Sequence, residues 1–535
     1  MSQYSWFFVN KNYLLFSILA TVLVIPVGFV AADFVFEAQK ADLESDGVNS
    51  FDGIQGPQGI EIFKNGTDSF ALVASFDDDS VTLVNLSNPK DIVVQDTLDG
   101  SILGTAAEGT TSEGRLKLDG ASSLAIFSNS TAGVLGNFAI VTSYLGDGIQ
   151  IIHAADSKSD TAHALYPTVN ASTPWGSPGL AYSGAGTGTG PVLKGLDGAM
   201  DVAVFINKTG AANLHGERYA IITGHVGDSI QLIDITDPEV GGELYYNASG
   251  NFMNATADGG TGTHAAADYL AQWGPNFHGR LPIDGAFGVD VFYTTETGNM
   301  PYAIVTGQVS DGFQIFSLND TSRGPVPFAN RTSSDTGFEL LDSPVGVATW
   351  NTTNNASDRW AIIASNYTDS VTVVSLSDPT NTTVTDTLQQ TSLLSLDGAL
   401  RVEVAKIGDR HYAFVTSNGT DAAVVADGGS QTHLESGGFQ VIDLYDPTNI
   451  QPVLSVTDNE GVGFGKLTAA HDVGVFSVDG HTYAAVLSYD DDSITIIQVT
   501  KDKTGGGSGG TCGVNIDCSA PSMSSNGGGV SINGA

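Results

Sequence analysis

The sequence predicts an all-β protein, a seven-bladed β-propeller of four-stranded antiparallel blades whose ring is closed by an N-terminal strand. Two observations lead to this fold. A two-part unit rich in β-branched and aromatic residues recurs seven times in the same order. Asp-Ser, Asp-Gly and Asn-Pro or Asp-Pro pairs supply turns at fixed places within it. One such unit cannot bury both of its faces, so neighbouring units must stack into a ring.

The first part of each unit is a single strand, seen in "LDGAMDVAVF" at 196–205. An Asp precedes it in five copies, at Asp119, Asp197, Asp284, Asp342 and Asp397. The seven predicted strands span 54–63, 118–127, 196–205, 283–292, 341–350, 396–405 and 467–476.

The second part is a pair of strands around a central turn, seen in "YAIITGHVGDSIQLIDITDP" at 219–238. In "SIQLIDI" apolar residues alternate with polar ones over much of the run, as a largely buried strand requires. The copies span 70–89, 138–157, 219–238, 302–320, 360–379, 412–418 with 437–447, and 483–499.

A weaker fourth strand follows the Asp-Pro turn, at 91–98, 382–389 and 450–458. The seventh copy has none, because a Gly-rich stretch comes next. Residues 34–42 resemble a fourth strand, so we expect them to complete the seventh blade. The alternative is a stalk without regular structure, but closure leaves no open edge strand.

The chain ends are predicted to lie outside the propeller, which we place at 33–500. Residues 1–32 carry an uncharged apolar run after Lys11 and small residues before Asp33, which predicts an export signal or a retained membrane anchor. Residues 501–511 are a Gly-rich linker. Residues 512–535 are a small tail, or the start of a further module, in which Cys512 and Cys518 are expected to form one disulfide.

Charge and sequons point to the cell exterior. The formal charge of −39 argues against nucleic-acid binding, and an acidic surface favours solubility outside the cell. Fourteen of the 29 Asn residues stand in N-x-S/T sequons, where about six would be expected by chance. Asn85 lies inside a predicted strand. The predicted glycosylation sites are Asn65, Asn129, Asn170, Asn207, Asn247, Asn254, Asn319, Asn330, Asn351, Asn355, Asn366, Asn381 and Asn418.

The paired strands share one pattern, which is a strand like Tyr-Ala-Ile-Val-Thr, a turn with Asp, and a strand like Ile-Asp-Ile-Thr-Asp-Pro. With this pattern they resemble the LVIVD-repeat family of extracellular β-propellers. They resemble more distantly the YVTN-type propellers of archaeal surface-layer proteins. The resemblance covers 54–500. It implies a secreted or cell-surface repeat protein and brings no catalytic motif.

The Asp of the central turn recurs at Asp79, Asp147, Asp228, Asp311, Asp369 and Asp492, and it should share one face with the Asp that precedes the first strand. The structural interpretation is that these side chains accept local backbone hydrogen bonds. The functional one is a cation site. No cofactor is required, but Ca²⁺ would suit two acidic triplets, which are Asp77, Asp78 and Asp79, and Asp490, Asp491 and Asp492.

The first strand of each unit should line the central channel, where the copies differ. Its polar residues could ligate a metal or hold a small polar molecule, or they could simply line a hydrated channel. They are Glu61, Asp201, Asp290, Arg401, Glu403, His471 and Asp472.

Long linkers (99–117, 158–195, 239–282 and 320–340) and an insertion (418–436) are expected on the same face as the Asp residues. Their aromatic residues could bind a partner or could pack on the propeller. The predicted binding residues are Trp175, Tyr182, Tyr269, Trp273 and His278.

We therefore predict an exported module that binds an extracellular protein or a glycan through its loop-rich acidic face. Association with the envelope or membrane would use the N-terminal segment or the tail. The alternative is an extracellular hydrolase or metal-dependent enzyme with its site at the channel mouth. No H-E-x-x-H or G-x-S-x-G motif supports an enzyme.

Overall fold

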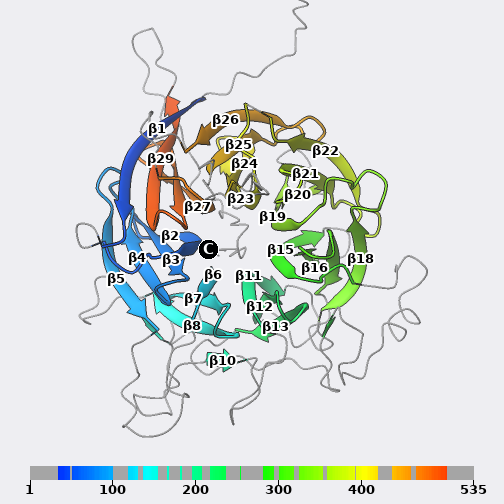
Figure 1. Ribbon diagram of the computed structural model, residues 1–535, viewed down its shortest axis with the longest axis horizontal. Coiled ribbons are helices and arrows are strands. Elements are labelled where there is room, and N and C mark those ends of the chain that lie inside the picture. Colours follow the sequence, from blue (N-terminus) through cyan, green and yellow to red (C-terminus); the bar gives the residue numbers. More distant parts are fainter. Residues whose placement is uncertain are drawn as a thin grey trace, which may run out of the picture.

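A computed structural model places the repeats in seven β-sheets around a central axis, which confirms the seven-bladed β-propeller (Figure 1). The structure describes residues 34–47, 51–100, 118–129, 136–154, 165–167, 181–183, 196–207, 217–235, 253–254, 281–294, 300–318, 325–352, 358–391, 393–419, 437–458 and 466–502. Within these ranges the regular structure is β-strand, and none of it is helix. No described helix could therefore cross a membrane.

The first four blades follow the order of the repeats, each with its strands in antiparallel sequence from the axis outward (Figure 1). Blade 1 consists of β2 (Pro57–Asn65), β3 (Asp68–Ser75), β4 (Ser80–Asn85) and β5 (Val93–Asp99). Blade 2 consists of β6 (Ala121–Asn129), β7 (Gly136–Ser143) and β8 (Gly148–Ala154), with β9 (Leu165–Pro167) and β10 (Ala181–Ser183) both paired to β8. Blade 3 consists of β11 (Ala199–Asn207), β12 (Glu217–Gly224), β13 (Ser229–Asp234) and the short β14 (Met253–Asn254). Blade 4 consists of β15 (Ala286–Thr294), β16 (Met300–Gly307), β17 (Gly312–Ser317) and β18 (Val326–Thr332).

The remaining three blades complete the ring. Blade 5 consists of β19 (Pro344–Asn351), β20 (Arg359–Ser365), β21 (Ser370–Ser375) and β22 (Thr383–Gln389). Blade 6 consists of β23 (Ala399–Ile407), β24 (Arg410–Ser417), β25 (Gly438–Asp443) and β26 (Gln451–Thr457). Blade 7 consists of β27 (Ala470–Val478), β28 (His481–Ser488) and β29 (Ser493–Asp502), with β1 (Phe34–Ser45) as its outer strand.

The N-terminal strand closes the ring, as the sequence predicts. β1 pairs antiparallel with β29 from Phe34 opposite Asp502 to Ser45 opposite Ser493. The first strand of the chain thus fills the position that a fourth strand fills in other blades, and blade 7 has no open outer edge. β29 runs two residues into the stretch predicted as a linker.

Each innermost strand begins with a β-bulge, and a side chain of the second strand fills it in four blades. In blade 3 the register shifts between Ala199 and Val202. The N–H of Asp201 there donates to Thr223 Oγ1 at 3.0 Å, and Thr223 Oγ1 donates to the Phe287 carbonyl of the next blade at 2.7 Å. A bulge leaves one amide outside the ladder, and the threonine hydroxyl both satisfies it and joins two blades.

The core lies between the blades. Each of the seven large hydrophobic clusters combines residues of two neighbouring blades, as in the cluster that packs Phe51 and Ile54 of blade 1 against Tyr483 and Ile496 of blade 7. Stacked aromatic pairs close the ends of the first two strands in five blades, with ring centroids 5.4–5.6 Å apart in Phe63–Phe70, Phe127–Phe138, Phe205–Tyr219, Phe292–Tyr302 and Phe476–Tyr483. The blades are therefore held together by apolar packing that no single repeat could form.

Three predicted linkers contain strands, which are β9 and β10 within 158–195, β14 within 239–282 and β18 within 320–340. Residues 320–340 were expected to form a loop, but β18 occupies 326–332 and pairs with β17 as the fourth strand of blade 4. The motif Asp-Pro is missing there, since the third strand is followed by Asn-Asp, so the pattern that marks other fourth strands does not appear. The predicted segments 1–32 and 512–535, with Cys512 and Cys518, lie outside the described residues.

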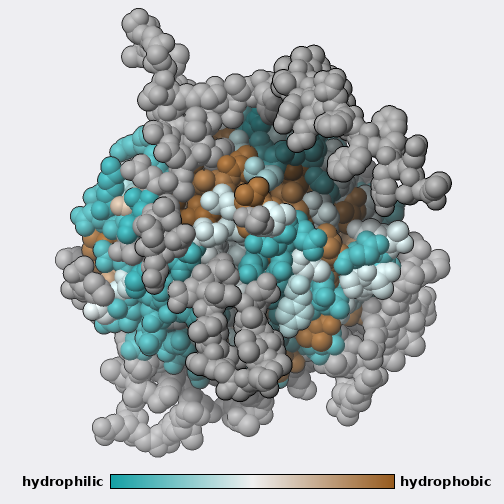
Figure 2. Space-filling model, turned by 45° about the horizontal axis from the view of Figure 1, so that its top comes forward, coloured by the Kyte–Doolittle hydropathy of each residue, from teal (hydrophilic) through white to brown (hydrophobic). Residues whose placement is uncertain are grey.

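The surface is mostly hydrophilic in the view of Figure 2, with hydrophobic surface in smaller patches toward the middle. The hydrophilic surface seen from this side agrees with the charge of −39.

Candidate functional site

The polar residues predicted to line the channel do lie on the innermost strands, but most of them are buried. Glu61, Asp201, Asp290, Arg401, Glu403 and Asp472 are between 1% and 4% exposed. His471 is half-buried, and its Nδ1 lies 2.8 Å from the Gln58 carbonyl. These side chains thus occupy the interior around the axis.

Three of the carboxylates join neighbouring blades. Asp290 Oδ1 accepts from its neighbour Val291 N at 2.7 Å, and Oδ2 accepts from Thr349 N of the next blade at 2.7 Å. Asp472 does the same with Val473 N at 2.8 Å and Ile60 N at 3.0 Å. The inner edge of an innermost strand has amides with no ladder partner, and these carboxylates satisfy them.

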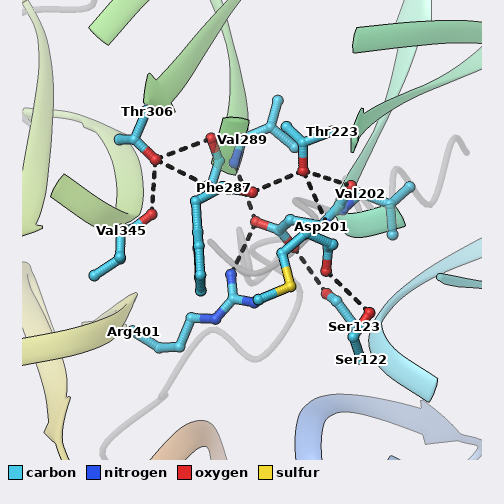
Figure 3. Close-up of polar contacts among 12 residues, drawn as sticks. Ser122, Ser123, Asp201, Val202, Thr223, Phe287, Val289, Thr306, Val345 and Arg401 are labelled. Atoms are coloured by element: carbon cyan, nitrogen blue, oxygen red, sulfur yellow. Dashed lines mark hydrogen bonds and ion pairs between the residues drawn. The ribbon is translucent and has the colours of Figure 1, made fainter. Parts of the chain in front are cut away.

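Asp201 makes the same connection and also faces a cation. Its Oδ1 accepts from Val202 N at 3.0 Å and Ser123 Oγ at 2.8 Å, and its Oδ2 accepts from Val289 N at 3.0 Å. Arg401 Nη1 lies 3.1 Å from Oδ2 (Figure 3). The pair joins blade 3 to blade 6, three blades further round the ring.

Arg401 is 1% exposed and lies over the Phe287 ring, with 4.9 Å between its Cζ and the ring centroid (Figure 3). Its contact with Asp201 is electrostatic, because Nε and Nη1 have no hydrogen-bond partner among the described residues. The guanidinium is thus held by a carboxylate and an aromatic face at the axis.

Burial shifts the protonation of the axial groups. Desolvation raises the pKa of Asp290 and of Asp472 to about 7, against the hydrogen bonds that favour their charged forms. Desolvation also raises the pKa of Asp201 despite Arg401, and that of Glu403, which Asp472 raises further. For His471, desolvation lowers the pKa to about 3, so this imidazole is neutral at physiological pH.

The recurring Asp of the central turn also joins blades. Each of the six accepts, through Oδ1, the N–H of the residue that leads into the first strand of the next blade. The pairs are Asp79–Gly120 (2.8 Å), Asp147–Gly198 (3.0 Å), Asp228–Gly285 (2.8 Å), Asp311–Ser343 (3.1 Å), Asp369–Gly398 (2.8 Å) and Asp492–Gly56 (2.8 Å). These aspartates have φ of 47–53°, a left-handed conformation that Asp tolerates better than most residues.

The acidic triplets point toward different partners. Asp77 Oδ1 accepts from the Tyr489 hydroxyl at 3.2 Å, Asp78 Oδ2 from Gln55 N at 2.8 Å, and Asp491 Oδ2 from Thr468 N at 3.0 Å. Within the described part of the chain, no three His, Cys, Asp or Glu side chains are arranged to hold a metal ion. Burial, together with Asp46, Asp52 and Asp492, raises the pKa of Asp78. A Ca²⁺ ion at the triplets remains a prediction without a coordinating geometry.

A second ring of equivalent positions surrounds the channel, and the sequence motifs do not single it out. We call it the rim; it consists of the residue after the second strand of each blade. The backbone N–H of every rim residue donates to the carbonyl of the residue leading into the first strand of its own blade, at 2.8–3.1 Å. The seven residues are Phe76, Tyr144, His225, Gln308, Asn366, Asn418 and Tyr489.

The rim has an aromatic half and an amide half. Ring centroids are 6.5 Å apart in Tyr489–Phe76, 6.1 Å in Phe76–Tyr144 and 6.1 Å in Tyr144–His225. The amide half follows in blades 4 to 6 and consists of Gln308, Asn366 and Asn418. His225 Nε2 and Gln308 Oε1 are 2.8 Å apart, and Asn366 Nδ2 lies 3.4 Å from Asn418 Oδ1.

Apolar side chains stand outside the rim on the same turns. Each follows a rim residue by one position, and they come from four consecutive blades. They are Leu145, Val226, Val309 and Tyr367, which are 54–71% exposed. We call the side of the ring that carries these turns the turn face. An exposed apolar series on one face of an acidic protein is a feature of binding surfaces.

The predicted loop aromatics are mostly outside the described residues. Trp175, Tyr269, Trp273 and His278 lie there. Tyr182 lies in β10, opposite Ile149 of β8, at the outer edge of blade 2. The predicted set of loop aromatics therefore stays a prediction.

The predicted glycosylation sites are distributed unevenly. Asn170, Asn247, Asn319 and Asn355 lie outside the described residues. Asn330 and Asn366 are each 6% exposed, so a glycan on either would require the side chain to turn out of the fold. The sites nearest the strand ends opposite the turn face are Asn65, Asn129, Asn207, Asn351 and Asn381, while Asn254 lies in β14 and Asn418 on the rim.

No protein-family model matches the sequence, and no curated protein matches it. A functionally unknown protein from Desulfotomaculum acetoxidans DSM 771 is similar in structure at 11% identity, with a TM-score of 0.39 over 76% of this chain and 88% of that one. The periplasmic gluconolactonase PpgL of Pseudomonas aeruginosa is similar at 12% identity, with a TM-score of 0.33 over 63% of this chain and 71% of that one. Similarities at this level assign no activity, and the resemblance to the LVIVD-repeat family stays a prediction.

Proposed function

We propose that the protein is an exported binding module that captures an extracellular protein or glycan on its turn face. The observation that carries the proposal is the distribution of the unshared residues. The axial carboxylates and the turn aspartates connect blades, whereas the rim and the exposed apolar series differ from blade to blade and lie on one side. Residues that break the symmetry of a rigid scaffold are the ones available for specific recognition.

The two ends of the propeller lie on the opposite side from this face. Phe34 pairs with Asp502, at the end of β29 away from the turn that carries Tyr489. The chain therefore enters and leaves the ring on the side opposite the rim. Attachment to an envelope through either end would leave the turn face directed outward.

A hydrolase at the channel mouth is the second candidate. The observation in its favour is the pKa of about 7 for Asp290 and for Asp472, since catalytic carboxyls often have raised pKa values. Both are buried and accept backbone hydrogen bonds from the next blade, an arrangement that stabilises the fold. If one were catalytic, Asp472→Asn would abolish turnover of an ester, lactone or glycoside that the wild type cleaves.

A blocking experiment tests the binding proposal. In the full chain, Leu145→Cys on the turn face and Tyr445→Cys on the opposite side each receive a maleimide-linked polyethylene glycol. Both positions are exposed, at 55% and 47%, so both should react without unfolding the protein. Capture of components from a native envelope extract should be lost only with the modified Leu145→Cys protein. Equal capture by the two modified proteins would contradict the proposal.

A further inference from the structure

We infer that the rim is a binding site for a neutral saccharide, with one face of a sugar ring against Phe76 and Tyr144 and its hydroxyl groups toward the amide half. This inference rests on the proposed function and gives it a site and a ligand class. It is carried by the division of seven equivalent positions into four adjacent aromatic residues and three adjacent amides.

The aromatic half provides an apolar platform in which neighbouring ring planes are inclined by 46–60° to one another. Phe76 and Tyr144 come from neighbouring blades, and the backbone of each is held by a hydrogen bond to its own blade, at 2.9 and 2.8 Å. Both residues are half-buried, so part of each remains accessible to solvent. The C–H groups on the face of a pyranose pack favourably on aromatic rings, and rigid aromatic side chains lose little entropy on binding.

The platform continues beyond the rim toward the axis. His471 lies 6.4 Å from Tyr489, and Phe287 lies 5.8 Å from His225, measured between ring centroids. Phe287 in turn packs with Val345 and Leu400 in a small hydrophobic cluster at the inner end of three neighbouring blades. These apolar groups are buried, so they support the aromatic half from the side of the axis and do not form its surface.

The amide half supplies the hydrogen-bonding groups that hydroxyls need. Gln308 and Asn418 are half-buried, and each can donate and accept through the same side chain, as a hydroxyl can. Asn366 is buried and supports Asn418, because its Nδ2 donates to Asn418 Oδ1 at 3.4 Å. His225 Nδ1 is buried without a hydrogen-bond partner among the described residues, although Nε2 has Gln308. This nitrogen is shielded from solvent, so a ligand hydroxyl would pair with it only after the imidazole turns.

Charge excludes acidic ligands. Asp77 and Asp490 follow rim residues directly on exposed turn positions, and Asp147 and Asp228 lie on the next turns. Sialylated, sulfated and uronic-acid sugars would therefore be repelled, and a neutral sugar would not.

The experiment is calorimetric titration of the full chain with maltose, cellobiose, lactose and diacetylchitobiose, with sialyllactose as the anionic comparison. At least one neutral disaccharide should bind, and sialyllactose should bind more weakly than lactose. Phe76→Leu and Tyr144→Leu remove the ring but keep apolar bulk, and each should weaken binding about tenfold. Gln308→Ala, on the amide half, should weaken binding as well.

The matched control is Tyr445→Leu, an exposed aromatic on the opposite side that stacks with Arg410 at 4.3 Å. It should leave the affinity unchanged. Choline tests the alternative that the rim binds an organic cation, because aromatic and acidic groups together also attract an ammonium group. The inference is overturned if no neutral disaccharide binds, if choline binds instead, or if the rim variants bind as the control does. The broader binding function would still stand if the modified Leu145→Cys protein had lost capture.

Discussion

Asp492 Oδ1 accepts a hydrogen bond from Gly56 N at 2.8 Å and so joins the last blade to the first across 436 positions of sequence. The same contact recurs at five other blade boundaries. At the seventh boundary, between blades 6 and 7, the insertion 418–436 interrupts the strand pair, and the described residues of that turn include no equivalent Asp. The recurring Asp therefore serves ring assembly, since it joins neighbouring blades at six of the seven boundaries.

Replacing Asp492 should weaken ring closure. Asp492→Ala removes a charged acceptor and places alanine, which tolerates a left-handed backbone less well than Asp, at φ +48°. The two effects together should lower the free energy of unfolding by about 2–4 kcal/mol. Asp492→Asn keeps an acceptor and tolerates this φ, so it should stay within about 1 kcal/mol of the wild type. Urea unfolding measures both. Asp490→Ala, in the same turn, is the control, and an equal loss there would contradict the assignment.

Replacing Arg401 should destabilise the protein through the carboxylate it leaves behind. Arg401→Met keeps much of the volume over Phe287 but leaves Asp201 buried without its cation, which should cost about 3–5 kcal/mol. Adding Asp201→Asn should recover part of that loss, because the unpaired charge is gone. Purely additive losses in the double variant would show that the ion pair is not coupled.

The raised pKa of Asp472 predicts a specific pH dependence. Between about pH 4 and 7 the unfolded chain has released this proton and the folded chain still holds it, so the wild type loses stability as the pH rises through this range. Asp472→Asn has no such proton. The stability of the wild type relative to this variant should therefore fall by an amount on the order of 4 kcal/mol from pH 4 to 7 and then level off.

Urea unfolding of both proteins at pH 4.5, 6 and 7.5 measures this difference. Asp91→Asn, at an exposed position, controls for the loss of one negative charge. A difference between wild type and Asp472→Asn that stays constant over the range would show that Asp472 ionises in the fold as it does in the unfolded chain.

Glycosylation should follow exposure and position. Secreted from a host that carries out N-glycosylation, the full chain should carry glycan on Asn381, which is exposed on the side opposite the turn face. Asn366 should remain unmodified, because it is 6% exposed and contacts Asn418 on the rim. Peptide mass spectrometry measures the occupancy of each site. High occupancy at Asn366 would place a glycan across the channel mouth and contradict the rim as a ligand site.

The repeats made the fold predictable, since each strand pair carries its own alternation and turn residues, and the position of β1 followed from the missing fourth strand of blade 7. The fourth strand of blade 4 was missed because it lacks the preceding Asp-Pro. Alternating apolar residues and turn motifs predict a strand from its own sequence. An outer strand that forms mainly by hydrogen bonding to its neighbour shows few of these features.

The candidate site was less predictable. The axial residues were located on the right strands, but sequence gave no sign that Asp290 and Asp472 bind backbone amides of the next blade. The rim could have been found by aligning the residue before each central turn, where Phe, Tyr, His, Gln, Asn, Asn and Tyr occur. Their division into an aromatic and an amide half becomes visible only when the repeats are closed into a ring, because Tyr489 and Phe76 are distant in sequence and adjacent in space.

The central claim is that recognition takes place at the rim, where equivalent positions carry different side chains. Its most direct test is a crystal structure of the full chain with the neutral disaccharide that binds best in the titration. The claim predicts a sugar ring against Phe76 and Tyr144, with hydroxyl groups within hydrogen-bond distance of Gln308 or His225. A sugar bound on the side of Tyr445, or at the outer edges of the blades with the rim empty, would contradict it.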